Sequence, residues 1–134
     1  MTNDESFEAF LKRREAVSGD YINGKAESLL EISTQKDPAT FFPPNGKTVE
    51  GAKGVNQANE QGAKSFGEGS KGRFEILQSG ADGELGYWTG IQHADAVLKG
   101  KDKPVPMKLR VTEVFRREGP DWQLVHRHAD ELKA

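Results

Sequence analysis

RVTEVFRREGPDWQLVHRHAD, residues 110–130, is the stretch that decides the fold of this chain. Apolar and polar side chains alternate on both sides of a Gly-Pro-Asp turn, a pattern typical of two β-strands joined in a hairpin. The stretch is also rich in Arg, His and Trp, so neither face of the predicted strands is fully polar. We therefore expect a sheet that is covered by helices on one face and by a partner subunit on the other.

The same pattern continues upstream of this hairpin. Turn-forming residues separate four predicted strands from one another, at residues 73–79, 84–98, 105–118 and 122–129. Consecutive strands with short connections form an antiparallel meander. A flexible connector, GEGSKG at residues 67–72, is predicted to precede it.

The first half of the chain is predicted to be mainly helical. After Ser6, a candidate N-cap, apolar residues recur with helical spacing, which predicts a helix over residues 6–22. Two further helices are predicted over residues 26–32 and 52–66, with a short strand at residues 40–42 between them. Helices followed by an antiparallel sheet indicate an α+β fold, here as one domain over residues 1–134.

Size and composition exclude several classes of function. The chain has 134 residues, 34% of them hydrophobic and 30% charged, with a net charge of −2, so no overall charge favours nucleic acid or an anionic membrane. It contains no cysteine, which excludes disulfides and cysteine nucleophiles. No apolar run approaches the roughly 20 residues of a membrane span, and the start, MTNDESFEAF, lacks the regions of a signal peptide. We therefore expect a soluble, cytoplasmic protein that contacts neither nucleic acid nor membrane.

Five segments carry a resemblance to a known family, and together they cover nearly the whole chain: YINGKAESLLEI, FFPPNG, VEGA, GELGYWTG and LRVTEVFRREGPDWQLVHRHAD. The chain resembles the SnoaL-like branch of the nuclear-transport-factor-like, ketosteroid-isomerase-like superfamily. Its last two strands are also similar to the end of the association domain of calcium/calmodulin-dependent kinase II.

The resemblance implies a curved antiparallel sheet that forms a half-open cone, with three N-terminal helices over its concave face, as in a cystatin-like α+β barrel. It further implies a blind pocket between sheet and helices, and usually a homodimer. It does not imply one function, because the superfamily contains isomerases, dehydratases, hydrolases and plain assembly modules.

Side chains two apart on a strand share a face, and alignment with the kinase association domain assigns the faces. The concave side, together with the first helix, is predicted to hold the ligand-binding residues Tyr21, Tyr87, Thr89, Arg110, Thr112 and Arg127. The opposite side is predicted to hold the dimer-interface residues Trp88, Phe115, Trp122, His126 and His128. A bulge would exchange the two faces, since a shift of one residue inverts every side chain that follows it.

Acid–base catalysis of the isomerase type needs a buried carboxylate as base and acidic donors for the developing oxyanion. Tyr21 and Tyr87 are candidate donors, and Asp95 and Glu113 are candidate bases. Asp95 lies near a strand end and is expected to be solvated, while Glu113 alternates with Thr112 and is expected to point away from the pocket. No complete dyad is predicted, and no residue is assigned as catalytic.

The arginines and histidines each allow two interpretations. Arg110 and Arg127 can hold an anionic group of a ligand or pair with Asp or Glu at the pocket mouth. His126 and His128 share a strand face and could bind a metal, but no third ligand stands at a recognised spacing, so no metal or cofactor is predicted. We expect them instead at an interface, where their titration would make the dimer sensitive to pH.

Two functions of different class remain open. The first is a small-molecule-binding protein whose pocket accepts an apolar ligand with an oxygenated end, and which could support isomerase-like, lyase or hydrolase chemistry without a cofactor. The second is a non-catalytic homodimeric association module.

Overall fold

The computed structural model describes residues 5–133, which form helices followed by a sheet in the predicted α+β order. In chain order the elements are α1 (Phe7–Tyr21), α2 (Glu27–Ile32), β1 (Thr40–Phe42), β2 (Val49–Glu50), α3 (Ala52–Ala63), β3 (Lys71–Asp82), β4 (Leu85–Val97), β5 (Pro104–Glu118) and β6 (Asp121–Glu131). Among these residues, no helix has the length and apolar character needed to cross a membrane.

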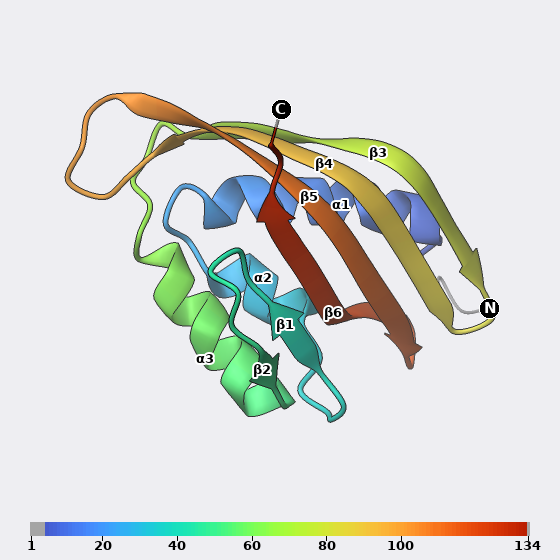
Figure 1. The fold of residues 1–134 in the computed structure, drawn as a ribbon. Coiled ribbons are helices and arrows are strands. Elements are labelled where there is room, and N and C mark those ends of the chain that lie inside the picture. The colour runs from blue at the N-terminus through green and yellow to red at the C-terminus, as the bar shows by residue number, and fades with distance from the viewer. Residues whose placement is uncertain (1–4, 134) are drawn as a thin grey trace.

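The strands form one curved, unclosed sheet in the order β2-β1-β6-β5-β4-β3 (Figure 1). Strands β3 to β6 are the predicted antiparallel meander. At its other edge β1 pairs parallel with β6, and β2, which was not predicted, pairs antiparallel with β1. The sheet is therefore mixed, and the expectation of a purely antiparallel sheet is corrected at this one strand pair.

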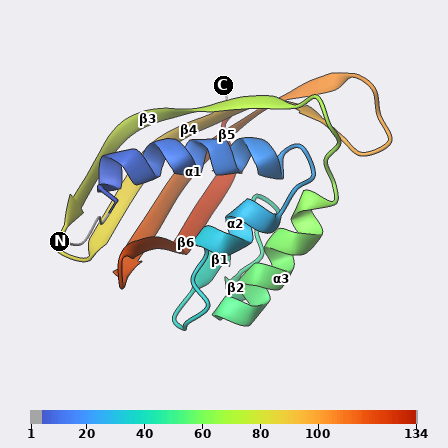
Figure 2. The same ribbon diagram turned by 180° about the vertical axis from the view of Figure 1, so that it is seen from behind.

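Helix α1 crosses the concave side of β3, β4 and β5, while α2 and α3 lie beside β6, β1 and β2 (Figure 2). The half-open cone predicted from the sequence is confirmed by this arrangement. The start of α1 follows from Ser6, whose Oγ accepts a hydrogen bond from the backbone N of Ala9 at 3.1 Å. The third helix is shorter than predicted, because it ends at Ala63 rather than at residue 66.

The concave face carries the large aromatic side chains of the core. Trp88 and Phe115 have no exposed surface and Trp122 is 2% exposed, and all three pack in one cluster with Phe10 of α1. The prediction that these three residues face a partner subunit is therefore wrong. Removing such large apolar surfaces from water stabilises the fold by several kcal/mol, which is why these side chains lie on the side of the sheet that the helices cover.

A β-bulge at Val125 changes the alternation along β6. The pairing with β5 passes from Phe115 opposite Leu124 to Val114 opposite His126, so one residue of β6 has no partner. Before the bulge, Trp122 and Leu124 are buried toward the helices; after it, Arg127 and Ala129 take that side. Strict alternation had placed Trp122 and the two histidines on one face, and the bulge separates them.

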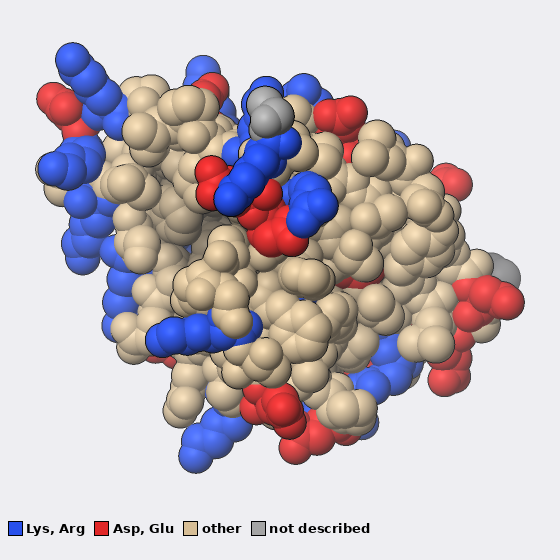
Figure 3. Space-filling model, viewed as in Figure 1, with Lys and Arg blue, Asp and Glu red and all other residues tan. Residues whose placement is uncertain are grey.

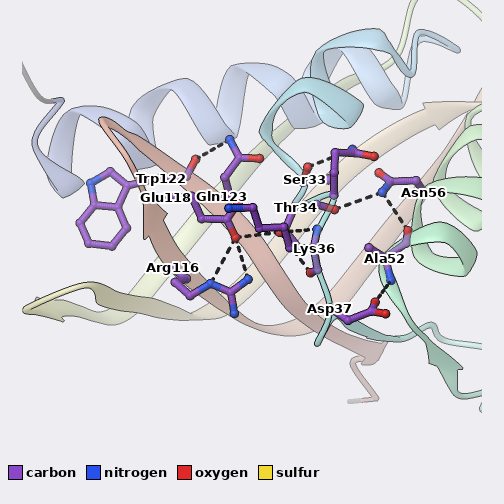
Figure 4. Close-up of polar contacts among 11 residues, drawn as sticks. Ser33, Thr34, Lys36, Asp37, Ala52, Asn56, Arg116, Glu118, Trp122 and Gln123 are labelled. Carbon is purple, nitrogen blue, oxygen red and sulfur yellow. Dashed lines mark hydrogen bonds and ion pairs between the residues drawn. The ribbon is translucent and has the colours of Figure 1, made fainter.

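Polar contacts hold α3 near the turn between β5 and β6 (Figure 4). The carboxylate of Glu118 accepts a hydrogen bond from Thr34 Oγ1 at 2.8 Å, and the amide of Asn56 donates to the backbone oxygen of Thr34 at 3.2 Å. Asp37 accepts from the backbone N of Ala52 at 2.7 Å and so caps α3. These bonds join α3 to the loop that follows α2, and that loop to the end of β5.

Candidate functional site

A cavity of about 160 Å³ lies between the three helices and strands β1, β4, β5 and β6. Its wall is mostly apolar, with Ile22, Leu29, Phe41, Pro44, Val55, Phe66, Ala94, Met107, Leu109, Leu124, Val125 and Ala129. An apolar cavity of about 150 Å³ accepts benzene, so this volume suits a compact ring or a short branched chain.

Beside this cavity lies a buried ion cluster centred on Glu113, whose side chain has no exposed surface. Arg14 donates to both carboxylate oxygens, from Nε at 3.0 Å and from Nη2 at 2.7 Å. Arg127 Nη1 donates at 2.7 Å and Trp88 Nε1 at 2.8 Å. The carboxylate therefore accepts four hydrogen bonds from α1, β4 and β6, and it joins the helix layer to the sheet.

The environment of Glu113 keeps it ionised. Burial alone raises the pKa of the carboxyl, but the charges and hydrogen bonds of Arg14 and Arg127 outweigh burial and lower the pKa from 4.5 to about 2. Glu113 was expected to point away from the pocket; it lies on the helix-covered side of the sheet, because the alternation of β5 is the reverse of the one assumed, but it does not line the cavity itself. A carboxylate with such a low pKa is nevertheless unsuited to accept a proton from a ligand.

Polar side chains on the cavity wall come from both layers. Arg127 Nη2 donates to Gln92 Oε1 at 2.7 Å, and Gln92 Nε2 donates to Ser18 Oγ at 3.3 Å. Tyr21 and Asn59 also line the cavity, and burial raises the pKa of the Tyr21 hydroxyl. Within residues 5–133 the wall contains no carboxylate, so it lacks the base that isomerase-type catalysis needs.

Of the residues predicted to bind a ligand, the structure brings Tyr21 and Arg127 to the cavity. The other four lie on the outer face of the sheet, where the burial pattern of β4 and β5 leaves them partly or fully exposed: Tyr87, Thr89, Arg110 and Thr112. Their predicted position on the concave side is wrong, since the buried partners of the alternation are Trp88 and Phe115.

The two arginines of the prediction have different partners. Arg110 forms an exposed two-point ion pair with Asp130, at 2.6 and 2.7 Å, on the outer face of the sheet. Arg127 is paired inside the protein with Glu113. Both side chains therefore pair with acidic residues, as one of the two interpretations held, but the first pair lies on the outer face and the second is buried, rather than at the pocket mouth.

His126 and His128 both contact β1; His128 is exposed on the outer face, whereas His126 is partly buried and also lines the cavity. The ring of Phe42 packs edge-on against both imidazoles, at centroid distances of 4.9 and 5.5 Å. Thr40 Oγ1 lies 2.7 Å from His126 Nδ1. Burial, followed by the neighbouring His128, lowers the pKa of His126. In the described part of the chain, no three His, Asp or Glu side chains are grouped as a metal site would require.

Sequence reasoning missed Arg14 and Asn59, and both had a signal. Arg14 is a charged residue on the apolar stripe of α1, between Phe10 and Val17, where burial is expected. Asn59 occupies the corresponding place on the buried face of α3. A charged or amide side chain on a buried stripe requires a polar partner, which a sequence does not identify.

Comparison with known proteins agrees with this architecture. A family model described as "SnoaL-like domain" matches residues 15–129. No curated protein matches the chain significantly.

Solved structures of similar fold share little sequence with the chain. One, described as a calcium/calmodulin-dependent protein kinase type II association domain from Thiobacillus denitrificans, is 15% identical with a TM-score of 0.73, and the alignment covers 97% of this chain and 98% of that one. Another, described as a dehydratase of the NTF2-like family from Streptomyces avermitilis, is 17% identical with a TM-score of 0.74, covering 93% and 94%. A third, described as a ketosteroid isomerase from Parabacteroides distasonis, is 16% identical with a TM-score of 0.66, covering 96% and 90%. At these identities the likeness concerns the fold alone.

Proposed function

The chain belongs to the SnoaL-like domain family, and on this premise we propose that it binds a small apolar molecule with an oxygenated end between its sheet and helices. The observation that carries the proposal is the cavity of about 160 Å³, whose apolar wall is interrupted by a few polar side chains. Pockets that bind small molecules have this composition, because apolar contact supplies affinity and a few polar groups supply orientation.

The proposal is tested by filling the cavity. Ala129 is 1% exposed and lines the wall, so Ala129→Leu places extra carbon atoms in the space a ligand would occupy. Thr112→Leu adds similar apolar bulk on the outer face and serves as the control. NMR titration with toluene, benzyl alcohol and benzoate should shift signals of cavity residues in the wild type and in Thr112→Leu, but not in Ala129→Leu. If none of the three compounds shifts them in the wild type, the binding function is refuted.

Acid–base chemistry is a narrower possibility within the same proposal. Because the described wall has no carboxylate, proton transfer would have to use His126 or Tyr21. A ligand identified by the titrations can be followed for exchange of its acidic hydrogens in deuterated water. Exchange that persists in His126→Gln and Tyr21→Phe would exclude both residues.

A second candidate function, homodimeric association, is supported by the outer face of the sheet. Figure 3 shows a broad uncharged area over β3 to β5, and Leu77, Leu85 and Tyr87 are 65, 56 and 36% exposed. Exposed apolar areas of this kind mark protein contacts. One structural neighbour is described as an association domain, which agrees with this function.

The oligomeric state can be tested by light scattering after size-exclusion chromatography. Leu85→Glu places a charge on the outer face and should convert a dimer into a monomer. Leu98→Glu is the matched control, since Leu98 is 39% exposed but follows the end of β4, away from this area. A wild-type monomer at 100 μM protein would argue against association through this face.

A further inference from the structure

The buried ion cluster carries more positive than negative charge. Arg14 and Arg127 are 3% and 15% exposed, and the carboxylate they share is that of Glu113. Two guanidinium groups against one carboxylate leave a surplus of one positive charge next to the cavity. An unbalanced charge in a protein interior is costly unless a counter-ion accompanies it.

One donor of the cluster also lacks a partner. Arg14 commits Nε and Nη2 to Glu113, while its Nη1 is buried and has no acceptor among residues 5–133. By contrast, both terminal nitrogens of Arg127 are used, on Glu113 and on Gln92. A buried guanidinium nitrogen without an acceptor is costly, and the described residues supply no acceptor for it.

The surplus charge lies at the cavity wall, although Arg14 Nη1 is itself buried. Arg14 and Arg127 both line the cavity, next to Tyr21 and Asn59, whose side chains can donate further hydrogen bonds. The rest of the wall is apolar except for Ser18, Thr40, Gln92 and His126, and the volume compares with that of a cavity that holds benzene.

We propose that the ligand is a compact monocarboxylate with an apolar body of about the size of one ring. This inference rests on the binding function proposed above and specifies the chemical class of its ligand. The carboxylate balances the surplus charge of Arg14 and Arg127, and its oxygens supply acceptors at this end of the cavity. A neutral amide or alcohol can accept hydrogen bonds there but leaves the charge unbalanced, so the site discriminates against it.

Isothermal titration with two ligands of equal shape tests the charge requirement. At pH 7, benzoate should bind the wild-type protein at least tenfold more tightly than benzamide. Arg14→Gln removes the surplus charge and should bring the two affinities to within about threefold of each other. Arg110→Gln is the matched control, because it removes an exposed arginine of the outer face and should leave the preference for benzoate unchanged.

The outcomes distinguish failure of the carboxylate inference from failure of the binding function. Equal affinity for benzoate and benzamide in the wild type overturns the carboxylate inference but keeps the binding function. If neither benzoate nor benzamide binds, and toluene and benzyl alcohol also fail to bind, then the carboxylate inference and the binding function are both overturned. Loss of benzoate binding in Arg110→Gln would place the anion on the outer face and overturn the inference as well. If Arg14→Gln does not fold, as judged by circular dichroism, the comparison in the wild type still decides.

Discussion

Replacing Glu113 by Gln tests whether the buried cluster is ionised and holds the helix layer to the sheet. The substitution keeps the shape of the side chain but removes the charge that Arg14 and Arg127 share. It also places an NH₂ group where the arginines require acceptors. Removing one partner of a buried ion pair costs about 3–5 kcal/mol, which is a large part of the 5–15 kcal/mol by which a domain is stable.

The lowered pKa of Glu113 gives an independent magnitude for its contribution to stability, and it determines how that contribution depends on pH. Because the pKa is lowered from 4.5 in the unfolded chain to about 2 in the folded one, ionisation contributes about 3 kcal/mol to folding at neutral pH. This contribution is complete above pH 4.5 and is lost as the pH falls toward 2. The difference between wild type and Glu113→Gln should therefore be largest at pH 7 and should shrink by about 3 kcal/mol at pH 2.

Urea denaturation followed by circular dichroism measures the loss of stability and its dependence on pH. At pH 7 the free energy of unfolding should fall by about 3–5 kcal/mol, equivalent to a loss of roughly 10–20 °C in Tm for a chain of this length. Glu75→Gln is the matched control: Glu75 is 46% exposed and pairs with His93 on the surface, so its loss should change stability by about 1 kcal/mol or less. A loss below 1 kcal/mol in Glu113→Gln that does not vary with pH would refute an ionised, stabilising carboxylate.

Three further changes have outcomes fixed by the structure. Gly90→Ala directs a methyl group at the backbone of Glu75 beside the bulge in β3, so unfolding experiments should detect a loss of about 1–3 kcal/mol. Gly62→Ala should shift the free energy of unfolding by no more than about 1 kcal/mol, since better helix propensity offsets the contact; the new methyl group nevertheless displaces the Tyr21 hydroxyl, and calorimetry should show weaker benzoate binding. Because the pKa of His126 is lowered by burial and then by its neighbouring histidine, the folded state resists its protonation. Stability should decrease as the pH falls below about 6.5, and comparison of urea midpoints at pH 7.5 and 5.5 should show a smaller decrease in His126→Gln. The same variant tests, by sedimentation, whether any dimer dissociates at low pH.

The sequence allowed the secondary structure to be predicted where the signal is local. The Ser6 cap, the apolar stripe of α1 and the turn signals between β3 and β6 depend on neighbours within a few residues, and the observed elements agree with them. The β1–β6 pairing was not predictable in this way. It joins Thr40 to His126, and a strand of three residues carries too little pattern to show which distant edge it meets.

The faces of the strands were the least secure part of the prediction. Alternation correctly divided β4 into two sets of side chains, but it does not say which set the helices cover. Assignment through the resemblance chose the wrong set, although Trp88 and Phe115 alone favoured burial. In β6 the bulge at Val125 then altered the alternation itself, and no residue type in the sequence requires a bulge there.

By itself, the sequence determined the class of fold, the order of helices and strands and the family resemblance, because each depends on local spacing or on contiguous motifs. Only the tertiary structure decided the candidate site. Arg14, Glu113 and Arg127 come from the first helix and from two strands about a hundred residues later, and they meet because α1 packs across the concave side of the curved sheet. The surplus charge that this creates is a sum over side chains distant in sequence, and it exists only once the chain has folded.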